Sequence, residues 1–244
     1  MSRLGNFAGR LGLENILEFI YPSFCLNCNR YIDYPGELIC EGCWHKATVM
    51  PLVICAGCGQ LIPDGTGCLN CRSPQKPLPA LTLGHYLDPL KNIIHQMKYH
   101  GYRKLSGELG ERLVGQYRAV LESFSIDLIV PIPLDYFREW KRGFNQAALL
   151  SDIIGERLNL PVAEQRLRKV RRTKDQTKLD PFEREANMRG AFRADSDMLK
   201  GKRILLVDDV VTTGTTLREA RRALNEAGAD AILALTVAAA GYDK

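Results

Sequence analysis

The segment Ile204–Leu217, I-L-L-V-D-D-V-V-T-T-G-T-T-L, places the strongest constraint on what this chain can fold into. It opens with an apolar run rich in β-branched residues, which is typical of a strand buried on both faces of a parallel sheet. Two adjacent carboxylates, Asp208 and Asp209, stand where the strand is expected to end, and a loop of threonines and one glycine follows. Apolar residues then recur at helical spacing until Gly228, which is placed to end a helix. The segment therefore predicts a strand, an acidic turn, a hydroxyl-rich loop and a helix.

The hydroxyl-rich loop is suited to binding a phosphate group. It leads into a helix N-terminus, where free backbone N–H groups and the positive end of the helix dipole favour an anion. Thr216 and Glu219 have the spacing of a capping box, and Gly214 is expected to let the backbone approach the ligand closely. Side-by-side carboxylates suit the two hydroxyl groups of a ribose. The candidate ligand-binding residues are Asp208, Asp209, Thr212, Thr213, Gly214, Thr215 and Thr216.

Other phosphate motifs fit this loop less well. It lacks the lysine of a P-loop and the three spaced glycines of a dinucleotide fingerprint, and its acids are adjacent rather than alternate as in an EF-hand. The segment instead resembles the 5-phosphoribosyl-1-pyrophosphate (PRPP) motif of type I phosphoribosyltransferases. That resemblance implies a Rossmann-like, mostly parallel α/β sheet with a hood or lid, PRPP or a ribonucleotide as ligand, and magnesium bound together with PRPP.

One position within the loop bears on chemistry. Purine-salvage members of the superfamily place an aspartate four residues after the first acid, where it exchanges a proton with the purine. This chain has Thr212 there, so general-base catalysis from the loop is not available. An oxopurine acceptor is therefore not expected, while a pyrimidine, an amine or ammonia, or no acceptor at all, stays open.

The cysteines form a second strong pattern, because all eight fall into four C-x2-C pairs. Two such pairs can make a tetrahedral four-thiolate site, which binds zinc and leaves no open position for catalysis. Disulfides are disfavoured in a reducing cytosol, and an iron–sulfur cluster is a weaker alternative. We therefore predict two structural zinc ions in a double zinc ribbon. In the simplest pairing, two C-x2-C pairs that are neighbours in sequence share one metal. An interleaved pairing stays open. The ligands are Cys25, Cys28, Cys40, Cys43, Cys55, Cys58, Cys68 and Cys71.

Composition along the chain indicates two domains. Residues 73–80 are rich in proline and carry no helical or strand period, so we place a boundary there. Residues 1–73 would hold an N-terminal helix and the zinc module, and residues 80–244 the phosphoribosyltransferase-like domain. The apolar spacing over residues 13–20 predicts an amphipathic helix that docks on its own protein, with a membrane or partner contact as the alternative.

The second domain has further predicted elements. Leu81–Tyr86 is expected to be an edge strand, Asp127–Ile132 a second buried strand and Ala231–Ala239 a third. Helices are expected over Pro89–Met97 and from about Lys104 to Leu121, because apolar residues recur there on one face.

Two basic segments flank the predicted site in sequence. Phe137–Gln146 follows the second buried strand as a basic, aromatic loop, and Arg166–Lys174 contains six basic residues and no acid. A type I phosphoribosyltransferase holds pyrophosphate in a loop after its first core strand and inserts a mobile lid before the PRPP motif. The alternative for both segments is a solvated charged surface. The pyrophosphate and lid candidates are Arg138, Lys141, Arg142, Lys174, Gln176 and Arg184.

The whole chain resembles the ComF family of competence-associated proteins. The resemblance rests on the four C-x2-C pairs, H-Y-L-D-P-L-K…H-Q-M-K-Y, V-P-I-P followed by R-G-F-N-Q, the lid pattern Q-T…R-E-x-N…A-F, and V-D-D-V-V-T-T-G-T-T. It implies a role in handling single-stranded DNA during natural transformation, with a competence helicase or other DNA-uptake proteins as partners. An active magnesium-dependent phosphoribosyltransferase and a non-enzymatic PRPP or nucleotide sensor are the alternatives.

Charge alone does not support DNA binding. The formal net charge is +5, but two zinc ions with four thiolates each would lower it to about +1. Only local clusters can then bind a strand, with Trp140 and Phe144 available to stack on bases. No apolar run is long enough to span a membrane and no signal peptide is evident, so the cytoplasm is expected. The DNA-binding candidates are Arg138, Trp140, Lys141, Arg142, Phe144, Arg166, Arg168, Lys169, Arg171, Arg172 and Lys174.

Overall fold

A computed structural model describes residues 23–33, 36–48, 52–56, 60–62, 68, 78–171, 173 and 186–241. The predicted helix over residues 13–20 and most of the predicted lid lie outside these residues. In chain order the elements are α2 (Glu41–Ala47), β1 (Leu52–Cys55), β2 (Pro79–His85), α3 (Leu90–Tyr99), α4 (Lys104–Ser123), β3 (Leu128–Pro131), α5 (Tyr136–Arg142), α6 (Gln146–Leu158), β4 (Leu167–Lys169), β5 (Phe192–Ala194), the 3-10 helix η2 (Ser196–Met198), β6 (Arg203–Val211), α8 (Thr215–Glu226) and β7 (Ala231–Ala239).

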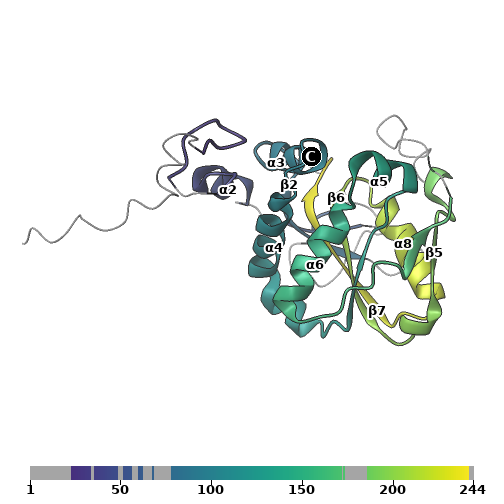
Figure 1. Ribbon diagram of the computed structural model, residues 1–244. Coiled ribbons are helices and arrows are strands. Elements are labelled where there is room, and N and C mark those ends of the chain that lie inside the picture. The colour runs from purple at the N-terminus through teal and green to yellow at the C-terminus, as the bar shows by residue number, and fades with distance from the viewer. Residues whose placement is uncertain are drawn as a thin grey trace, which may run out of the picture.

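The described strands build a mostly parallel α/β sheet (Figure 1). Its order is β1-β2-β7-β6-β3, and β2, β7, β6 and β3 run parallel. Helices α3, α4 and α6 cover one face, while α8 and the separate antiparallel pair β4–β5, which we call the hood, cover the other. The predicted fold class is confirmed.

Strand β6 lies in the interior of this sheet, as its apolar run predicted. Leu205 and Val207 pack on the side of α4 and α6, whereas Ile204 and Leu206 pack on the side of α8 and the hood. Alternate residues of a strand point to opposite faces, so a strand covered on both sides must be apolar throughout. The acids begin just beyond Val207, where the neighbouring strand β3 ends, but β6 does not end at them as predicted: it continues to Val211, still paired with β7.

The prediction that Leu81–Tyr86 forms an edge strand was wrong. Strand β2 lies between β7 and β1, because Leu52–Cys55 pairs with it antiparallel along Thr82 to Pro79. The Tyr117 hydroxyl contacts both strands, because its proton is shared between the carbonyls of Thr82 (2.6 Å) and Leu52 (3.2 Å). Burial raises the pKa of Tyr117 to about 12. A strand from the segment assigned to the zinc module thus completes the sheet. The boundary at residues 73–80 stays a prediction.

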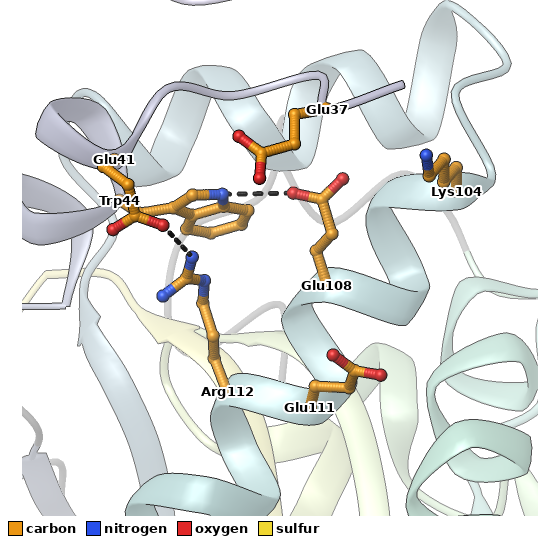
Figure 2. A pocket seen from close by; sticks show the side chains of 7 residues that line it. All are labelled: Glu37, Glu41, Trp44, Lys104, Glu108, Glu111 and Arg112. Atoms are coloured by element: carbon orange, nitrogen blue, oxygen red, sulfur yellow. Dashed lines mark hydrogen bonds and ion pairs between the residues drawn. The ribbon is translucent and has the colours of Figure 1, made fainter. Parts of the chain in front are cut away.

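The N-terminal part also packs on helix α4, around the buried side chain of Trp44 (Figure 2). The indole Nε1 of Trp44 donates to Glu108 Oε2 (3.1 Å), and the Arg112 guanidinium lies 4.2 Å from the indole centroid. Arg112 also pairs with Glu41 at 3.7 Å. Helix α2 is therefore held against α4 by an aromatic contact, a hydrogen bond and an ion pair.

Helices α5 and α8 both begin differently from what the sequence predicted. The basic segment after β3 is not a loop: Asp135 accepts a hydrogen bond from the backbone N–H of Arg138 (3.1 Å), which starts α5, and Gly143 ends it with a φ of +79°. The capping box of Thr216 and Glu219 does not form. Gly214 is the N-cap of α8, and Glu219 Oε1 instead accepts from the backbone N–H of Gly190 in the hood (2.6 Å).

Among the described residues, no helix is both long and apolar enough to cross a membrane.

The contact that joins β1, β2 and α4 can be tested with Tyr117→Phe. Removing the hydroxyl takes a donor from two buried carbonyls, so we expect the free energy of unfolding to fall by about 1 kcal/mol or more. Urea unfolding of the full chain measures this. The matched control is Tyr136→Phe, because that side chain is 86% exposed and should show no change. Equal stabilities for the two variants would contradict the role assigned to Tyr117.

Candidate phosphate and ribose site

The two acids in the C-terminal part of β6 meet a lysine from another element. The Lys98 ammonium lies 2.8 Å from Asp209 Oδ1, and the two side chains are only 14% and 15% exposed. The backbone N–H of Asp209 donates to Asp208 Oδ1 (2.8 Å), which fixes the first carboxylate relative to the second. Sequence reasoning assigned no role to Lys98. Its position at the end of helix α3 gave no local sign that it would reach β6, and only the H-Q-M-K-Y motif drew attention to the segment.

Burial raises the pKa of Asp208 to about 7, and the neighbouring Asp209 carboxylate adds to the rise. The ammonium groups of Lys98 and Lys169 oppose it. A cation or hydroxyl donors placed at this carboxylate would favour its ionised form. Paired carboxylate oxygens are also the donors that magnesium prefers, so the residues fit the metal that the family resemblance implies. Asp208 and Asp209 would hold it, together with oxygen atoms of a bound ligand.

Lys169 lies inside the site rather than on the surface. Its ammonium is 3.9 Å from Asp135 Oδ2, and its side chain is 9% exposed. Burial lowers the pKa of Lys169, while the carboxylates of Asp135 and Asp208 act in the opposite direction. The low exposure of this side chain counts against the predicted DNA contact of Lys169, which stays a prediction. Lys169 is better placed to face an anionic ligand beside Asp208.

The loop after the acids is held by one arginine. Arg218 Nη1 donates to the carbonyl of Thr213 (2.8 Å), and Nη2 donates to the hydroxyl of Thr215 (3.1 Å). The hydroxyls of Thr213 and Thr215 are themselves 2.8 Å apart. Gly214 has a φ of +69°, and a Cβ atom there would lie 2.6 Å from the carbonyl carbon of Ala56. The glycine is thus required by packing against Ala56, so a Gly214→Val change would disturb the fold and not only ligand binding.

Helix α5 lies at the same edge of the sheet as the acids. It follows β3, which pairs in parallel with β6, and parallel strands present their carboxyl ends at one edge. Arg138 pairs with Asp135 at 3.3 Å, and Arg142 Nη1 donates to Gln146 Oε1 (2.6 Å). Lys141 is exposed. The basic side chains of α5 are therefore near the predicted site, although two of them already have protein partners.

The aromatic residues of this segment divide into two kinds. Trp140 is 72% exposed and Phe137 is 55% exposed, and their ring centroids are 6.3 Å apart. Phe144 is only 8% exposed, with the Arg103 guanidinium 4.7 Å from its ring. The prediction that Phe144 stacks on a base was wrong, since its ring is packed in the protein. Sequence reasoning missed Phe137, whose place two residues after Asp135 gave no sign of which way it would point.

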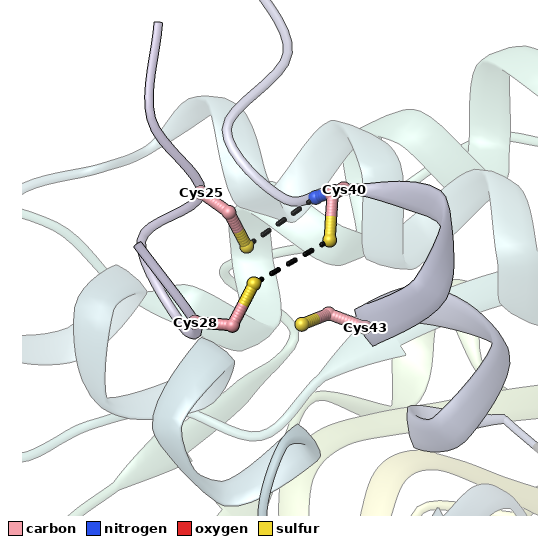
Figure 3. Close-up of side chains that lie close together, drawn as sticks. All are labelled: Cys25, Cys28, Cys40 and Cys43. Carbon is pink, nitrogen blue, oxygen red and sulfur yellow. Dashed lines mark hydrogen bonds between the residues drawn. The ribbon is translucent and has the colours of Figure 1, made fainter. Parts of the chain in front are cut away.

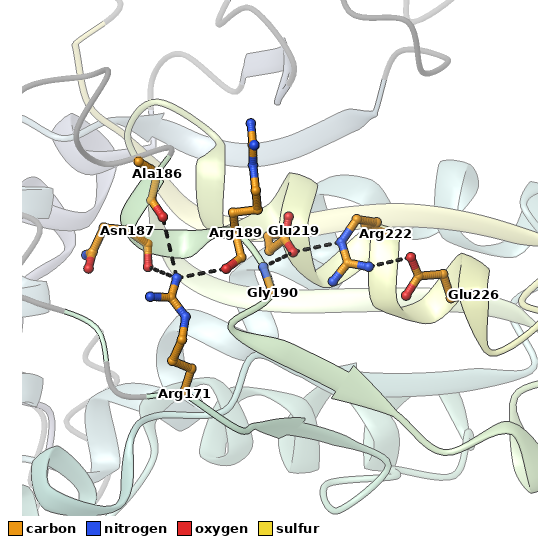
Figure 4. Close-up of polar contacts among 8 residues, drawn as sticks. All are labelled: Arg171, Ala186, Asn187, Arg189, Gly190, Glu219, Arg222 and Glu226. Atoms are coloured by element: carbon orange, nitrogen blue, oxygen red, sulfur yellow. Dashed lines mark hydrogen bonds and ion pairs between the residues drawn. The ribbon is translucent and has the colours of Figure 1, made fainter.

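The basic run is not a uniform binding surface (Figure 4). Arg171 Nη2 donates to the carbonyls of Arg189 (2.7 Å) and Asn187 (2.8 Å), so it braces the hood. Arg166 pairs with Asp195 at 2.7 Å across β4 and β5. Arg168 is exposed. The remaining candidates of the run and the lid lie outside the described residues: Arg172, Lys174, Gln176 and Arg184.

Four of the cysteines gather into one cluster (Figure 3). The sulfur atoms of Cys25, Cys28, Cys40 and Cys43 lie within 4.8 Å of one another. The backbone N–H of Cys40 points at Cys25 Sγ (3.4 Å), and the Asn27 amide donates to Cys43 Sγ (3.2 Å). Thiolates that receive N–H groups in this way suit a tetrahedral zinc site. The first pair shares its site with the second, as the simplest pairing predicted.

The second predicted site is described only in part. Cys55 is buried at the end of β1, and Cys68 is partly exposed. Cys58 and Cys71 lie outside the described residues.

Comparison with known proteins agrees with this arrangement. Residues 140–244 match the family model of the phosphoribosyl transferase domain, and residues 16–72 match that of the double zinc ribbon domain. Competence protein F of Haemophilus influenzae is 30% identical over 215 residues, 85% of this chain and 93% of that protein. DNA utilization protein YhgH of Escherichia coli K12 is 31% identical over 218 residues, 86% of this chain and 94% of that protein. Competence protein ComFC of Bacillus subtilis is 28% identical over 227 residues, 86% of this chain and 91% of that protein.

Fold and site together define a phosphoribosyltransferase-like protein with an N-terminal double zinc ribbon. The chain belongs to the ComF family, the family of competence protein F and its relatives.

The raised pKa of Asp208 gives a prediction for the ligand-free protein. Its pKa is higher in the folded chain than in the unfolded one, so stability is greatest below the unfolded value of about 4 and falls as the pH rises towards about 7. Asp208→Asn removes this titration. We expect the variant to be more stable than the wild type at pH 8, by more than about 1.4 kcal/mol, and to differ less at pH 5.

Thermal and urea unfolding across this pH range, without magnesium, test the prediction. Asp230→Asn is the control, because that carboxylate is 62% exposed and should leave the pH profile unchanged. A pH-independent difference between Asp208→Asn and the wild type would contradict the burial of a titrating carboxylate.

Proposed function

We propose that this protein binds PRPP or a ribonucleotide at the carboxyl end of β6, with magnesium, and handles single-stranded DNA during DNA uptake. One observation carries the ligand proposal: two partly buried carboxylates precede a hydroxyl loop at the N-terminus of α8, and Lys98 pairs with the second carboxylate. The acids suit the ribose hydroxyls, and the loop and helix dipole suit the 5′-phosphate. Lys98 and Lys169 supply positive charge for a pyrophosphate group.

Magnesium fits the same site. When bound, it would neutralise the acids and the pyrophosphate oxygens together. The residues of this chain would then hold the ribose through Asp208 and Asp209 and the 5′-phosphate through the loop. Strand β4 of the hood carries Lys169, and the hood would exclude water from one side of the ligand.

Two further proposals differ in whether the site transfers a phosphoribosyl group: an active phosphoribosyltransferase does, and a PRPP or nucleotide sensor does not. Thr212 stands where a purine base would need a proton acceptor, so an oxopurine is not the acceptor we propose. An active enzyme would release pyrophosphate from PRPP in the presence of a pyrimidine, an amine or ammonia. A PRPP or nucleotide sensor would bind PRPP without consuming it and would act through a protein partner, such as a helicase of DNA uptake.

The DNA proposal is supported by helix α5 and by the relatives' names, which refer to competence and DNA utilization. No residue of α5 is buried, and its exposed rings stand among Arg138, Lys141 and Arg142. Exposed aromatic rings interleaved with cations suit a single strand, since bases stack on rings while cations contact phosphates. The aromatic platform we propose is Tyr136, Phe137 and Trp140.

We also propose two structural zinc ions, one held by the described cluster of four cysteines and one by the remaining two pairs. Such ions would stabilise the N-terminal part, because zinc binding free energy is folding free energy in sites of this kind. Reduced thiolates of this type are consistent with the cytoplasm, where we place the protein.

The ligand proposal predicts calorimetric binding of PRPP in the presence of magnesium. Asp209→Ala should lower the affinity at least about tenfold, because a hydrogen bond to a charged group contributes about 1.5–3 kcal/mol. Ribonucleoside monophosphates should bind more tightly than their 2′-deoxy counterparts, which lack one of the hydroxyls. Asp197→Ala, at an exposed acid in η2, is the control. Undiminished affinity in Asp209→Ala would place the ligand elsewhere.

The DNA proposal predicts different effects for rings and cations. Trp140→Ala should weaken binding of a single strand by about 1–3 kcal/mol without changing its salt dependence. Lys141→Ala combined with Arg168→Ala should make the log–log salt slope less steep, by about 0.7 for each phosphate that the protein no longer neutralises. Fluorescence titrations at several salt concentrations measure both quantities. If neither variant changes affinity or slope, α5 and the hood do not contact the strand.

A further inference from the structure

Two segments far apart in sequence meet at the phosphate loop. Ala56 directly follows Cys55, in the third C-x2-C pair, and both residues are fully buried. Gly214 lies against Ala56, where any Cβ atom would overlap the Ala56 carbonyl group. Only a glycine, which also tolerates the positive φ of this position, lets the two backbones approach so closely. The loop that we propose to bind phosphate therefore rests on backbone from the zinc-ribbon part of the chain.

Arg218 connects the same two segments by hydrogen bonds. Its Nη1 donates to the carbonyl of Ala56 (3.0 Å) as well as to the carbonyl of Thr213 (2.8 Å). A guanidinium group is planar and presents its donors in a rigid geometry, so it fixes the relative orientation of its acceptors. One side chain thus sets the position of the loop relative to the end of β1.

The same arginine also orients the hydroxyl groups of the loop. Because Nη2 donates to the Thr215 hydroxyl oxygen, the proton of that hydroxyl is directed towards another acceptor. Thr213 Oγ1 lies 2.8 Å from Thr215 Oγ1, and either hydroxyl can donate in that contact, so Arg218 holds one member of this hydroxyl pair directly. Arg218 therefore contacts the loop at the Thr213 carbonyl and at the Thr215 hydroxyl, beside the place where the phosphate would lie.

We propose that Arg218 is a positioning residue for the phosphate ligand, and that it makes ligand affinity depend on the docking of Leu52–Ala56 against the loop. The inference rests on the proposed function, since the ligand is the 5′-phosphate of PRPP or a ribonucleotide. Coupling between two sites is reciprocal, so ligand binding must stabilise the docked segment by the same factor by which docking improves binding. The zinc-ribbon part would then contribute to nucleotide binding without touching the nucleotide.

The variants that test this are Arg218→Met, which keeps the aliphatic stem, and Arg218→Lys, which keeps a charge and a donor. Calorimetry with PRPP and magnesium, and with uridine 5′-monophosphate, gives the affinities. Arg218→Met should bind both at least about tenfold more weakly, and Arg218→Lys should recover part of the loss. The control is Arg222→Met, since Arg222 lies on the same helix but pairs with Glu219 and Glu226. Its affinity should stay within about twofold of the wild type.

Hydrogen exchange supplies a readout that a purely structural role would not change. The backbone N–H of Ala56 donates to the carbonyl of Leu78 (2.9 Å), so its exchange reports on docking of the segment. Added ligand should slow exchange over residues 52–56 in the wild type and in Arg222→Met, but not in Arg218→Met at saturating ligand. If Arg218→Met fails to fold, the same comparison is made between the wild type and Arg218→Lys, in which the slowing should be smaller.

The outcomes separate the two proposals. If the wild type binds PRPP or the nucleotide and Arg218→Met binds equally well, the positioning role is wrong and the ligand site stands. If ligand leaves exchange over residues 52–56 unchanged in the wild type, the coupling is wrong. If the wild type binds neither ligand, the proposed function fails and this inference fails with it.

Discussion

The enclosure of strand β6 is the constraint on which the rest of this structure depends. It is hydrogen-bonded to parallel strands on both sides and covered on both faces, so no charged side chain can lie along its interior. Charge can enter only in the last part of the strand, beyond the point where β3 ends beside Val207, and Asp208 and Asp209 stand there. Because parallel strands end at a common edge, the segment after β3 arrives beside the same acids.

The acids at this edge create an electrostatic problem that other elements relieve. Two adjacent carboxylates in a partly buried site repel each other, and burial makes the ionised form of Asp208 less favourable. Lys98 from α3 and Lys169 from the hood place positive charge against them. A site that holds such charges without a ligand lowers the stability of the folded protein, and in exchange it is ready to bind a charged ligand. In the function we propose, the same lysines are available to the anionic groups of PRPP.

The zinc-ribbon part and the α/β part depend on each other physically. Strand β1 completes the sheet, Trp44 packs on α4, and Ala56 supports the loop after the acids. A metal that holds the cysteines in place would therefore also hold an edge of the sheet. The family resemblance covers both parts, and the contacts give a physical reason why the two would occur together in one chain.

Sequence patterns determined the elements whose signals are local. The apolar run of β6, the helix ending near Gly228 and the strand Ala231–Ala239 were all predicted, because burial on both faces and helical spacing are visible in a single segment. The four cysteines of the first cluster could be paired because two C-x2-C pairs suffice for one tetrahedral metal. The order of the motifs identified the family.

Only the tertiary structure decided which side chains share a place. Lys98 meets Asp209, Arg171 braces the hood, Phe144 is buried, and Ala56 occupies the space that Gly214 leaves. Residues of one chemical type, such as the arginines of the basic run, have no pattern that separates a surface cation from one bonded to a carbonyl. That distinction depends on contacts between segments distant in the chain, and periodicity within one segment carries no information about them.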